Sequence, residues 1–125
     1  MRDYDEARDY YVNKLGFELV DDTPQGEGKR WLLVAAPGAK ETRLLLAKAV
    51  GDAQIAQIGR QCGGRVFLIL HTDDFEGDYR KFTARGVHFC ETPRHEPYGT
   101  VAVFEDLYGN RWDLIEMKPL PKNSL

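Results

Sequence analysis

The chain repeats itself at an offset of 70 residues, and this internal repeat limits its possible folds more than any other feature. The stretch "DYDEARDYYVNKLGFELV" from Asp3 aligns with "DDFEGDYRKFTARGVHFC" from Asp73, so that Gly16 meets Gly86. Each copy opens with acidic residues suited to a helix N-terminus and continues as an amphipathic helix. A Gly then stands where the helix should end, and an apolar strand follows it.

Two further strands follow in each copy. "RWLLVAA" from Arg30 aligns with "TVAVFED" from Thr100, and "ETRLLLAK" from Glu41 aligns with "RWDLIEMK" from Arg111. Gly-bearing turns, "APGAK" and "LYGN", join the strands of each pair. The second copy also has an apolar run of strand length, "GRVFLILHTDD", ahead of its helix. Its counterpart would precede Met1, so we expect the leading strand of the first copy to be absent or to lie upstream.

The repeat predicts an α+β fold with two tandem βαβββ units forming a curved mixed sheet around a cleft. At 125 residues the chain is long enough for one domain, 1–125. We place unit one at about 1–50, a linker at about 51–63 and unit two at about 64–118. The linker stretch "AQIAQIG" is compatible with a short helical turn.

Composition narrows the functional classes. Hydrophobic residues make up 42% and charged residues 30%, as in ordinary globular proteins. A net charge of -3 gives no electrostatic case for binding nucleic acid. No apolar run reaches the length of a membrane span, and the N-terminus is too polar for a signal peptide. Cys62 and Cys90 lack CxxC spacing, so we expect reduced thiols and a cytoplasmic protein.

Two tandem βαβββ units in a chain of this length resemble the vicinal oxygen chelate superfamily, which includes glyoxalase I, bleomycin-resistance proteins and extradiol dioxygenases. The resemblance covers almost the whole chain and is strongest in "GGRVFLILHTDDFEGDYRKFTARGV" and "EPYGTVAVFEDLYGNRWDLIE". It implies strongly curved sheets with a helix on the convex side of each, and a cleft enclosed by two units. In this family the two units often come from different subunits. We therefore expect a homodimer that binds a small molecule.

Metal-dependent members of this family place one ligand on the first and one on the last strand of each unit. By that alignment Asp113, in "GNRWDLIE", occupies a ligand position. Phe67 stands where a His ligand is usual, the last strand of unit one offers Arg43 and Leu45, and the fourth position would precede Met1. The resemblance thus predicts no cofactor, and a divalent metal is disfavoured. Asp113 and His71 are weak candidate ligands.

Asp113 and Arg43 are equivalent at the offset of 70, so we predict that they approach a shared cleft from its two sides. They would form a charge-assisted pair, or Arg43 would offer a fork to an anionic ligand, or the two would be an ordinary salt bridge at the rim. Phe67, His71 and Tyr98 are predicted to line the same pocket, although aromatic residues fit core packing equally well. His71 is either a general base or a strand-end histidine.

Three functions remain open, and the sequence does not decide whether the protein is an enzyme. The first is a metal-free protein of the bleomycin-resistance kind that binds a small molecule in a cleft between units. The second is a metal-dependent lyase, isomerase or ring-cleaving dioxygenase with a non-standard ligand set. The third is an interaction domain whose cleft is filled by its own side chains. His88 and His95 are expected to be structural or solvent-exposed.

Overall fold

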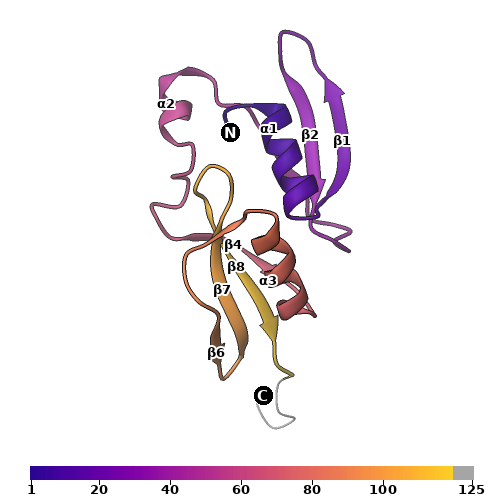
Figure 1. Cartoon of the computed structure of the whole chain (residues 1–125). Helices are drawn as coiled ribbons and strands as arrows, with labels where there is room; N and C mark the ends of the chain where they lie inside the picture. Colours follow the sequence, from indigo (N-terminus) through magenta and orange to yellow (C-terminus); the bar gives the residue numbers. More distant parts are fainter. Residues whose placement is uncertain (120–125) are drawn as a thin grey trace.

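The computed structural model describes residues 1–119, which form two halves that each pack a helix on a sheet (Figure 1). The first half contains α1 (Tyr4–Asp9), a π-helical turn η1 (Tyr10–Lys14), β1 (Glu18–Pro24), β2 (Arg30–Ala35) and β3 (Leu44–Leu45). The linker forms α2 (Gly51–Ala56). The second half contains β4 (Val66–His71), α3 (Phe75–Ala84), β5 (His88–Phe89), β6 (Arg94–Glu96), β7 (Gly99–Glu105) and β8 (Arg111–Met117). The α+β class predicted from the repeat is confirmed.

The strands are divided between two sheets. The first sheet has the order β1-β2-β3 and is antiparallel throughout. The second has the order β4-β8-β7-β5, with β6 also paired to β7, and its β4–β8 pair is parallel. Both β3 and β4 are therefore edge strands, and only the second sheet is mixed. Within residues 1–119 no helix is long and apolar enough to cross a membrane.

Matching caps define the two helices, but at an offset that differs by one residue from the predicted one. The Asp3 carboxylate accepts the N–H of Glu6 at 2.9 Å, and the Asp74 carboxylate accepts the N–H of Gly77 at 3.1 Å. The caps therefore lie 71 residues apart, and the alignment of Asp3 with Asp73 is wrong. The glycines that end the two helical segments remain 70 apart, so the first helix has one extra residue. The π-helical turn Tyr10–Lys14 accommodates it.

The last strand of the first unit is also displaced relative to the prediction. The pairing of β1 with β2 and of β5 with β7 keeps the offset of 70, which makes Leu33 equivalent to Val103. Leu33 pairs with Leu45, whereas Val103 pairs with Asp113. The counterpart of Asp113 is therefore Leu45, because the preceding turn is two residues longer in the first unit. The alignment of Arg43 with Asp113 is wrong.

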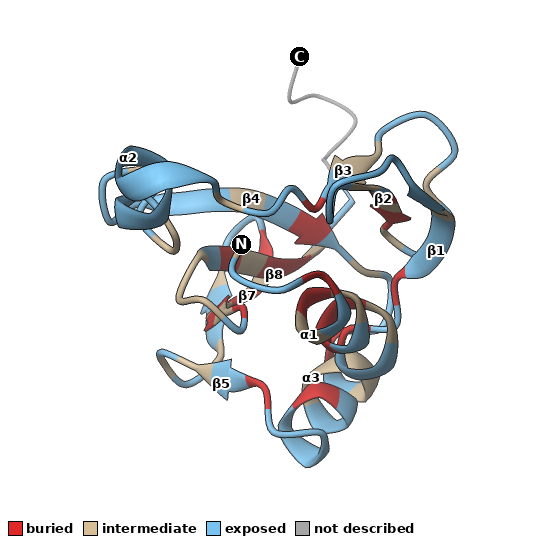
Figure 2. Ribbon diagram, turned by 90° about the horizontal axis from the view of Figure 1, so that it is seen from above, coloured by how far each residue is buried: buried red, intermediate tan, exposed pale blue. Residues whose placement is uncertain are grey.

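The core lies between the helices and one face of each sheet (Figure 2). Tyr11, Phe17 and Trp112 form a chain of aromatic contacts across the two halves, with ring centroids 5.3 to 6.2 Å apart. The Tyr10 hydroxyl donates to the carbonyl of Glu105 at 2.9 Å, again joining the first helix to the second sheet. The two halves thus share one core. Its other buried members include Ala7, Leu15, Leu32, Val34, Phe75, Phe82, Ala102, Phe104 and Leu114.

Met1 makes the backbone hydrogen bonds of a parallel strand pair with the segment that follows β3. Its amino group donates to the carbonyl of Ala47 at 2.8 Å, and the N–H of Ala49 donates to the carbonyl of Met1 at 2.8 Å. This pairing corresponds to that of β4 with β8 in the second half. Met1 therefore stands in the place of the leading strand of the first unit, which we expected to be absent or to lie upstream.

Candidate functional site

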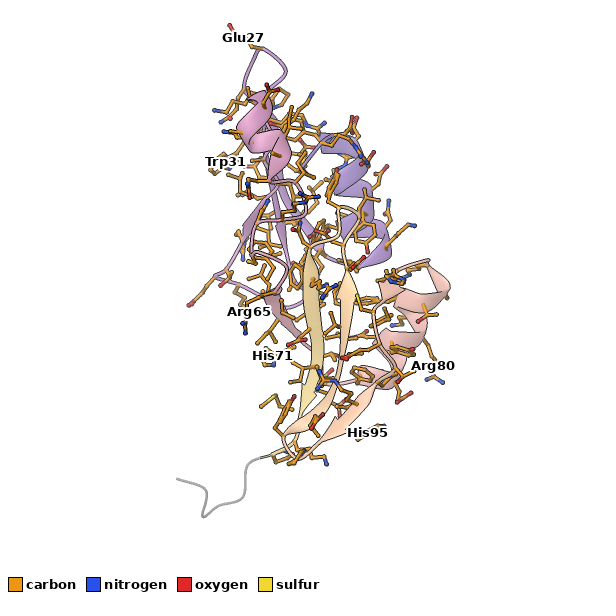
Figure 3. The ribbon with its side chains drawn as sticks, turned by 90° about the vertical axis from the view of Figure 1, so that its left-hand side faces the viewer. Glu27, Trp31, Arg65, His71, Arg80 and His95 are labelled. Atoms are coloured by element: carbon orange, nitrogen blue, oxygen red, sulfur yellow. The ribbon has the colours of Figure 1, made fainter. Side chains whose placement is uncertain are left out.

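The face of the second sheet away from the helices, which we term the open face, carries two of the residues predicted for the site. On β8, Trp112 and Leu114 belong to the helix-side core, so alternation places Arg111, Asp113 and Ile115 on the open face. Figure 3 shows the His71 and Trp31 side chains on the side of the ribbon opposite α3. Helices α1 and α3 thus cover one side of each sheet, and the short linker helix α2 lies beside Trp31 on the other side.

Asp113 lies in the middle of this face between apolar neighbours. Val103 on β7 and Ile69 on β4 are its cross-strand partners. Its carboxylate is partly buried, and among residues 1–119 it has no hydrogen-bond or ion-pair partner. Burial raises the pKa of the Asp113 carboxyl, an effect opposed by the charge of Arg94 and reinforced by that of Glu91. The carboxylate oxygens still reach the surface, because Trp112 Nε1 is the one fully buried side-chain N or O atom without a partner among the described residues. A partly desolvated carboxylate that remains accessible marks a candidate ligand contact.

The surroundings of Asp113 form an apolar floor with an exposed edge. Val101 and Ile115 are buried, with exposed fractions of 1% and 6%. Toward β4 the face becomes accessible, since Ile69 is 55% exposed, and Phe67 on the same strand is 37% exposed. Exposed apolar side chains beside one carboxylate suit a ligand with an apolar body and a hydrogen-bond donor.

The structure brings two of the five predicted residues onto the open face. By strand alternation His71, at the end of β4, shares it with Asp113, whereas Phe67 is the unpaired residue of a β-bulge in β4, where alternation does not fix the side, and lines a cavity with Tyr11 and Trp112. Tyr98 is 43% exposed and lies just before β7. Arg43 belongs to the first half, and its guanidinium donates to the carbonyls of Ala39 and Thr42 at 3.3 and 3.2 Å. Among the described residues no ion pair joins Arg43 to Asp113, so the direct pair does not form within one chain, and the alternative that Arg43 binds an anionic ligand stays a prediction.

Two cavities lie between the halves, on either side of the core residues Leu44 and Trp112. One has a volume of about 300 Å³ and includes Phe67 in its lining. The other has a volume of about 470 Å³ and includes Ile69 and His71. The indole N–H of Trp112 is buried and has no hydrogen-bond partner among the described residues. Residues of β4 therefore border the gap between the two halves, with Phe67 at one cavity and Ile69 and His71 at the other.

Asp106 is a buried carboxylate that the sequence did not single out. It is 7% exposed and accepts hydrogen bonds from the Tyr11 hydroxyl at 2.8 Å and from the N–H groups of Tyr108 and Asn110, each at 2.9 Å. Burial, together with the charge of Asp106, raises the pKa of Tyr11. These bonds close the β7–β8 turn onto the first helix, so Asp106 is a structural residue. "EDLYGN" indicated only a turn, and nothing in it pointed to Tyr11.

Among residues 1–119 the candidate metal ligands from the sequence do not come together with a third ligand. His71 pairs with Ile115 in the β4–β8 register and is exposed, and within this range neither His71 nor Asp113 belongs to a group of three potential ligands. The described part of the chain contains one such group, made of His88, Cys90 and Glu105. It lies toward β5, at the other edge of the sheet from β4.

The fold and the two-unit arrangement define a class of small α+β proteins with open curved sheets, and comparison with known proteins identifies the family. Residues 1–114 match the model of the Glyoxalase/Bleomycin resistance protein/Dioxygenase superfamily, and the chain belongs to this family. An uncharacterized protein of Shewanella frigidimarina (strain NCIMB 400) is 54% identical over 118 residues, covering 94% of this chain and 87% of the relative.

Two solved structures of similar sequence share the fold. UcmS2 superposes with a TM-score of 0.78 and 31% identity, covering 90% of this chain and 89% of its own. TnmS3, described as an antibiotic binding protein from Streptomyces sp. CB03234, has a TM-score of 0.71 and 34% identity, covering 94% of this chain and 89% of its own. The predicted superfamily is therefore confirmed, and its relatives include a binding protein.

Proposed function

We propose that this protein binds a small molecule on the open face of its second sheet, through Asp113. The observation that carries the proposal is the partly buried, unpartnered carboxylate of Asp113 on an apolar floor. A donor group of a ligand, a cationic amine above all, would supply the missing partner. An aromatic or aliphatic body would cover Phe67 and Ile69, which are exposed in the single chain.

The similarity to TnmS3 supports binding rather than turnover. TnmS3 is described as an antibiotic binding protein, and the present chain is 34% identical to it over most of its length. Binding by apolar contact and one charged hydrogen bond requires no group that transfers protons or electrons. We therefore propose sequestration of an amphiphilic, positively charged compound as the activity.

We further propose that the working form is a homodimer. The first sheet has an equivalent open face, the one away from α1, which presents Trp31 and Leu45 with exposed fractions of 41% and 49%. Two open faces, one apolar and one bearing Asp113, would enclose a ligand if the first unit of one chain covered the second unit of another. The dimer would also remove both apolar faces from water.

Fluorescence titration tests the proposal, because Trp31 and Trp112 are intrinsic reporters on the two halves. The first ligand is bleomycin, which the family description names, followed by a panel of aromatic amines and their neutral analogues. We expect saturable binding by at least one amine. Asp113→Asn should weaken this binding about tenfold or more, because the variant loses a charge-assisted hydrogen bond to the ligand.

The control variant is Glu76→Gln, which removes an exposed carboxylate from α3 on the helix side. It should bind as the wild type does. An equal loss of affinity in both variants would indicate a general charge effect. Unchanged affinity in Asp113→Asn would show that the ligand binds elsewhere. Absence of saturable binding across the panel would contradict the proposed function.

A further inference from the structure

Three side chains with metal-binding atoms converge at the β5 edge of the second sheet. His88 on β5 pairs directly with Glu105 on β7. Cys90 continues the same ladder, since its N–H donates to the carbonyl of Val103 at 2.8 Å. Alternation places His88 and Cys90 on one face, whereas Phe89 between them packs on the aromatic core. One imidazole nitrogen, the thiol sulfur and one carboxylate oxygen lie within 4.8 Å of one another.

From this geometry we infer that His88, Cys90 and Glu105 form a site for a borderline transition-metal ion, with Zn²⁺ the best match. Imidazole nitrogen, thiolate sulfur and carboxylate oxygen are the three ligand types that protein zinc sites use. Tetrahedral bonds of about 2.0 to 2.3 Å place donor atoms roughly 3.5 Å apart, so atoms that lie within 4.8 Å of one another need to close by no more than about 1.3 Å. His88 and Cys90 are exposed, which leaves their side chains free to make this adjustment. Three protein ligands leave the fourth position to water or another ligand.

The site differs from the ligand pattern that the family resemblance implies. That pattern uses the first and last strands of a unit, here β4 and β8. The three proposed ligands instead come from β5, from the residue following it and from β7. A metal in this place is therefore compatible with the loss of ligands at Phe67 and Leu45.

Charged neighbours modify the site without filling it. Arg111 lies 3.8 Å from a Glu105 carboxylate oxygen, and its side chain is 49% exposed, so the ion would displace a long, solvated contact. Glu91 is engaged by Arg94 at 2.9 Å. Burial and the neighbouring carboxylates raise the pKa of the free Cys90 thiol. A bound cation would reverse this effect, because a coordinating thiol loses its proton.

Metal binding would stabilise the pairing of β5 with β7 at the edge of the second sheet. The β5 strand contains two residues, and its ladder with β7 is correspondingly short. An ion held by His88, Cys90 and Glu105 links the two strands by side-chain bonds in addition to that ladder. Because the ion binds the folded chain, it should raise the midpoint of thermal unfolding.

Cobalt titration tests the site directly, since Co²⁺ occupies zinc sites and absorbs light. The protein is stripped of metal with a chelator, kept reduced and titrated with Co²⁺ and then with Zn²⁺ in competition. We expect one equivalent of Co²⁺ to bind with a thiolate-to-cobalt charge-transfer absorption, and Zn²⁺ to displace it. Cys90→Ser should abolish that absorption, and His88→Asn and Glu105→Gln should each weaken Co²⁺ binding at least tenfold.

The matched control is Cys62→Ser, which removes the chain's other thiol, and Glu76→Gln is the control for loss of a carboxylate away from the site. Both should bind Co²⁺ as the wild type does. Addition of Zn²⁺ should raise the unfolding midpoint of the wild type and of Cys62→Ser, with no rise in Cys90→Ser. Absence of the charge-transfer absorption from the wild type, or its persistence in Cys90→Ser, would overturn the inference.

Discussion

Leu45 occupies in the first sheet the position that Asp113 occupies in the second. Each pairs with the equivalent residue of the preceding strand, Leu33 and Val103. The two open faces therefore differ in chemistry at matching positions: one has an aliphatic side chain and the other a partly buried carboxylate. The Leu45 side chain has no atom that can bind a metal ion. The first unit therefore lacks, at this position, the equivalent of the candidate ligand Asp113. In the dimer that we propose, this asymmetry would favour a ligand with one charged end and one apolar end.

Asp113 should destabilise the fold at neutral pH. Burial raises its pKa in the folded state above the unfolded value, so the folded chain favours the protonated form. The penalty is complete above the folded pKa and is relieved as the pH falls through it. We expect Asp113→Asn to be more stable than the wild type at pH 7, by less than about 1 kcal/mol because the side chain is partly solvated.

Urea unfolding of both proteins at about pH 7 and about pH 4 measures this difference. The advantage of Asp113→Asn should shrink at the lower pH. A variant less stable than the wild type at neutral pH would show that the carboxylate is stabilised in the folded chain, and the argument for a missing partner would fail.

Tyr11→Phe should destabilise the protein more than Tyr10→Phe. Both hydroxyls join the first helix to the second sheet, but Tyr11 donates to the Asp106 carboxylate and Tyr10 donates to a backbone carbonyl. Loss of a hydrogen bond to a buried charged group costs about 1.5 to 3 kcal/mol, and loss of a neutral one about 0.5 to 1.5 kcal/mol. Chemical denaturation gives both values. Equal losses would mean that Asp106 is satisfied by its turn partners alone.

The helical segments and the order of the elements could be predicted from the sequence because their signals are local. An acidic cap begins α1 and α3, a Gly follows each of these two helical segments, and strands come after it. Asp113 could be assigned to the open face for the same reason, since alternation within one strand suffices.

The relation between the two units could not be read from the same signals. One extra residue in the first helix and two in a turn shift the offset from 71 to 70 to 68 along the chain. The first helical segment accommodates its extra residue as a π-helical turn. The turn before β3 accommodates its two extra residues without a change in the hydrophobic pattern of the strands. Contacts between distant residues left no signal either: Tyr11 and Asp106 are 95 residues apart.

Gly59→Ala should disrupt the packing of the linker on the β7–β8 turn. Gly59 and Gly63 both have positive φ, 74° and 59°, so alanine is strained at either position. A Cβ at Gly59 would collide with the carbonyl oxygen of Tyr108, whereas a Cβ at Gly63 meets open space. Gly63→Ala should cost about 1 to 2 kcal/mol, and Gly59→Ala a further 1 to 3 kcal/mol, approximately the penalty of overpacking.

Thermal or urea unfolding of the pair separates the collision from the backbone strain that both share. A larger loss in Gly59→Ala would confirm that the linker is seated against Tyr108. Similar losses would show that the linker moves away from Tyr108 without cost. The cavity of about 300 Å³, which Gly59 and Tyr108 both line, would then be open at this end.

Hydrogen exchange should be faster in the first sheet than in the second. The central strands β2 and β7 are equivalent, but β3 pairs with β2 through two residues, whereas β8 pairs with β7 along seven. β8 is also covered on its other side by β4. Local opening of the β2 ladder therefore breaks fewer bonds than opening of β7. Exchange followed by mass spectrometry should show lower protection for 30–35 than for 99–105. Equal protection would mean that the shared aromatic core makes the two halves open together, because Tyr11, Phe17 and Trp112 must then separate in either event.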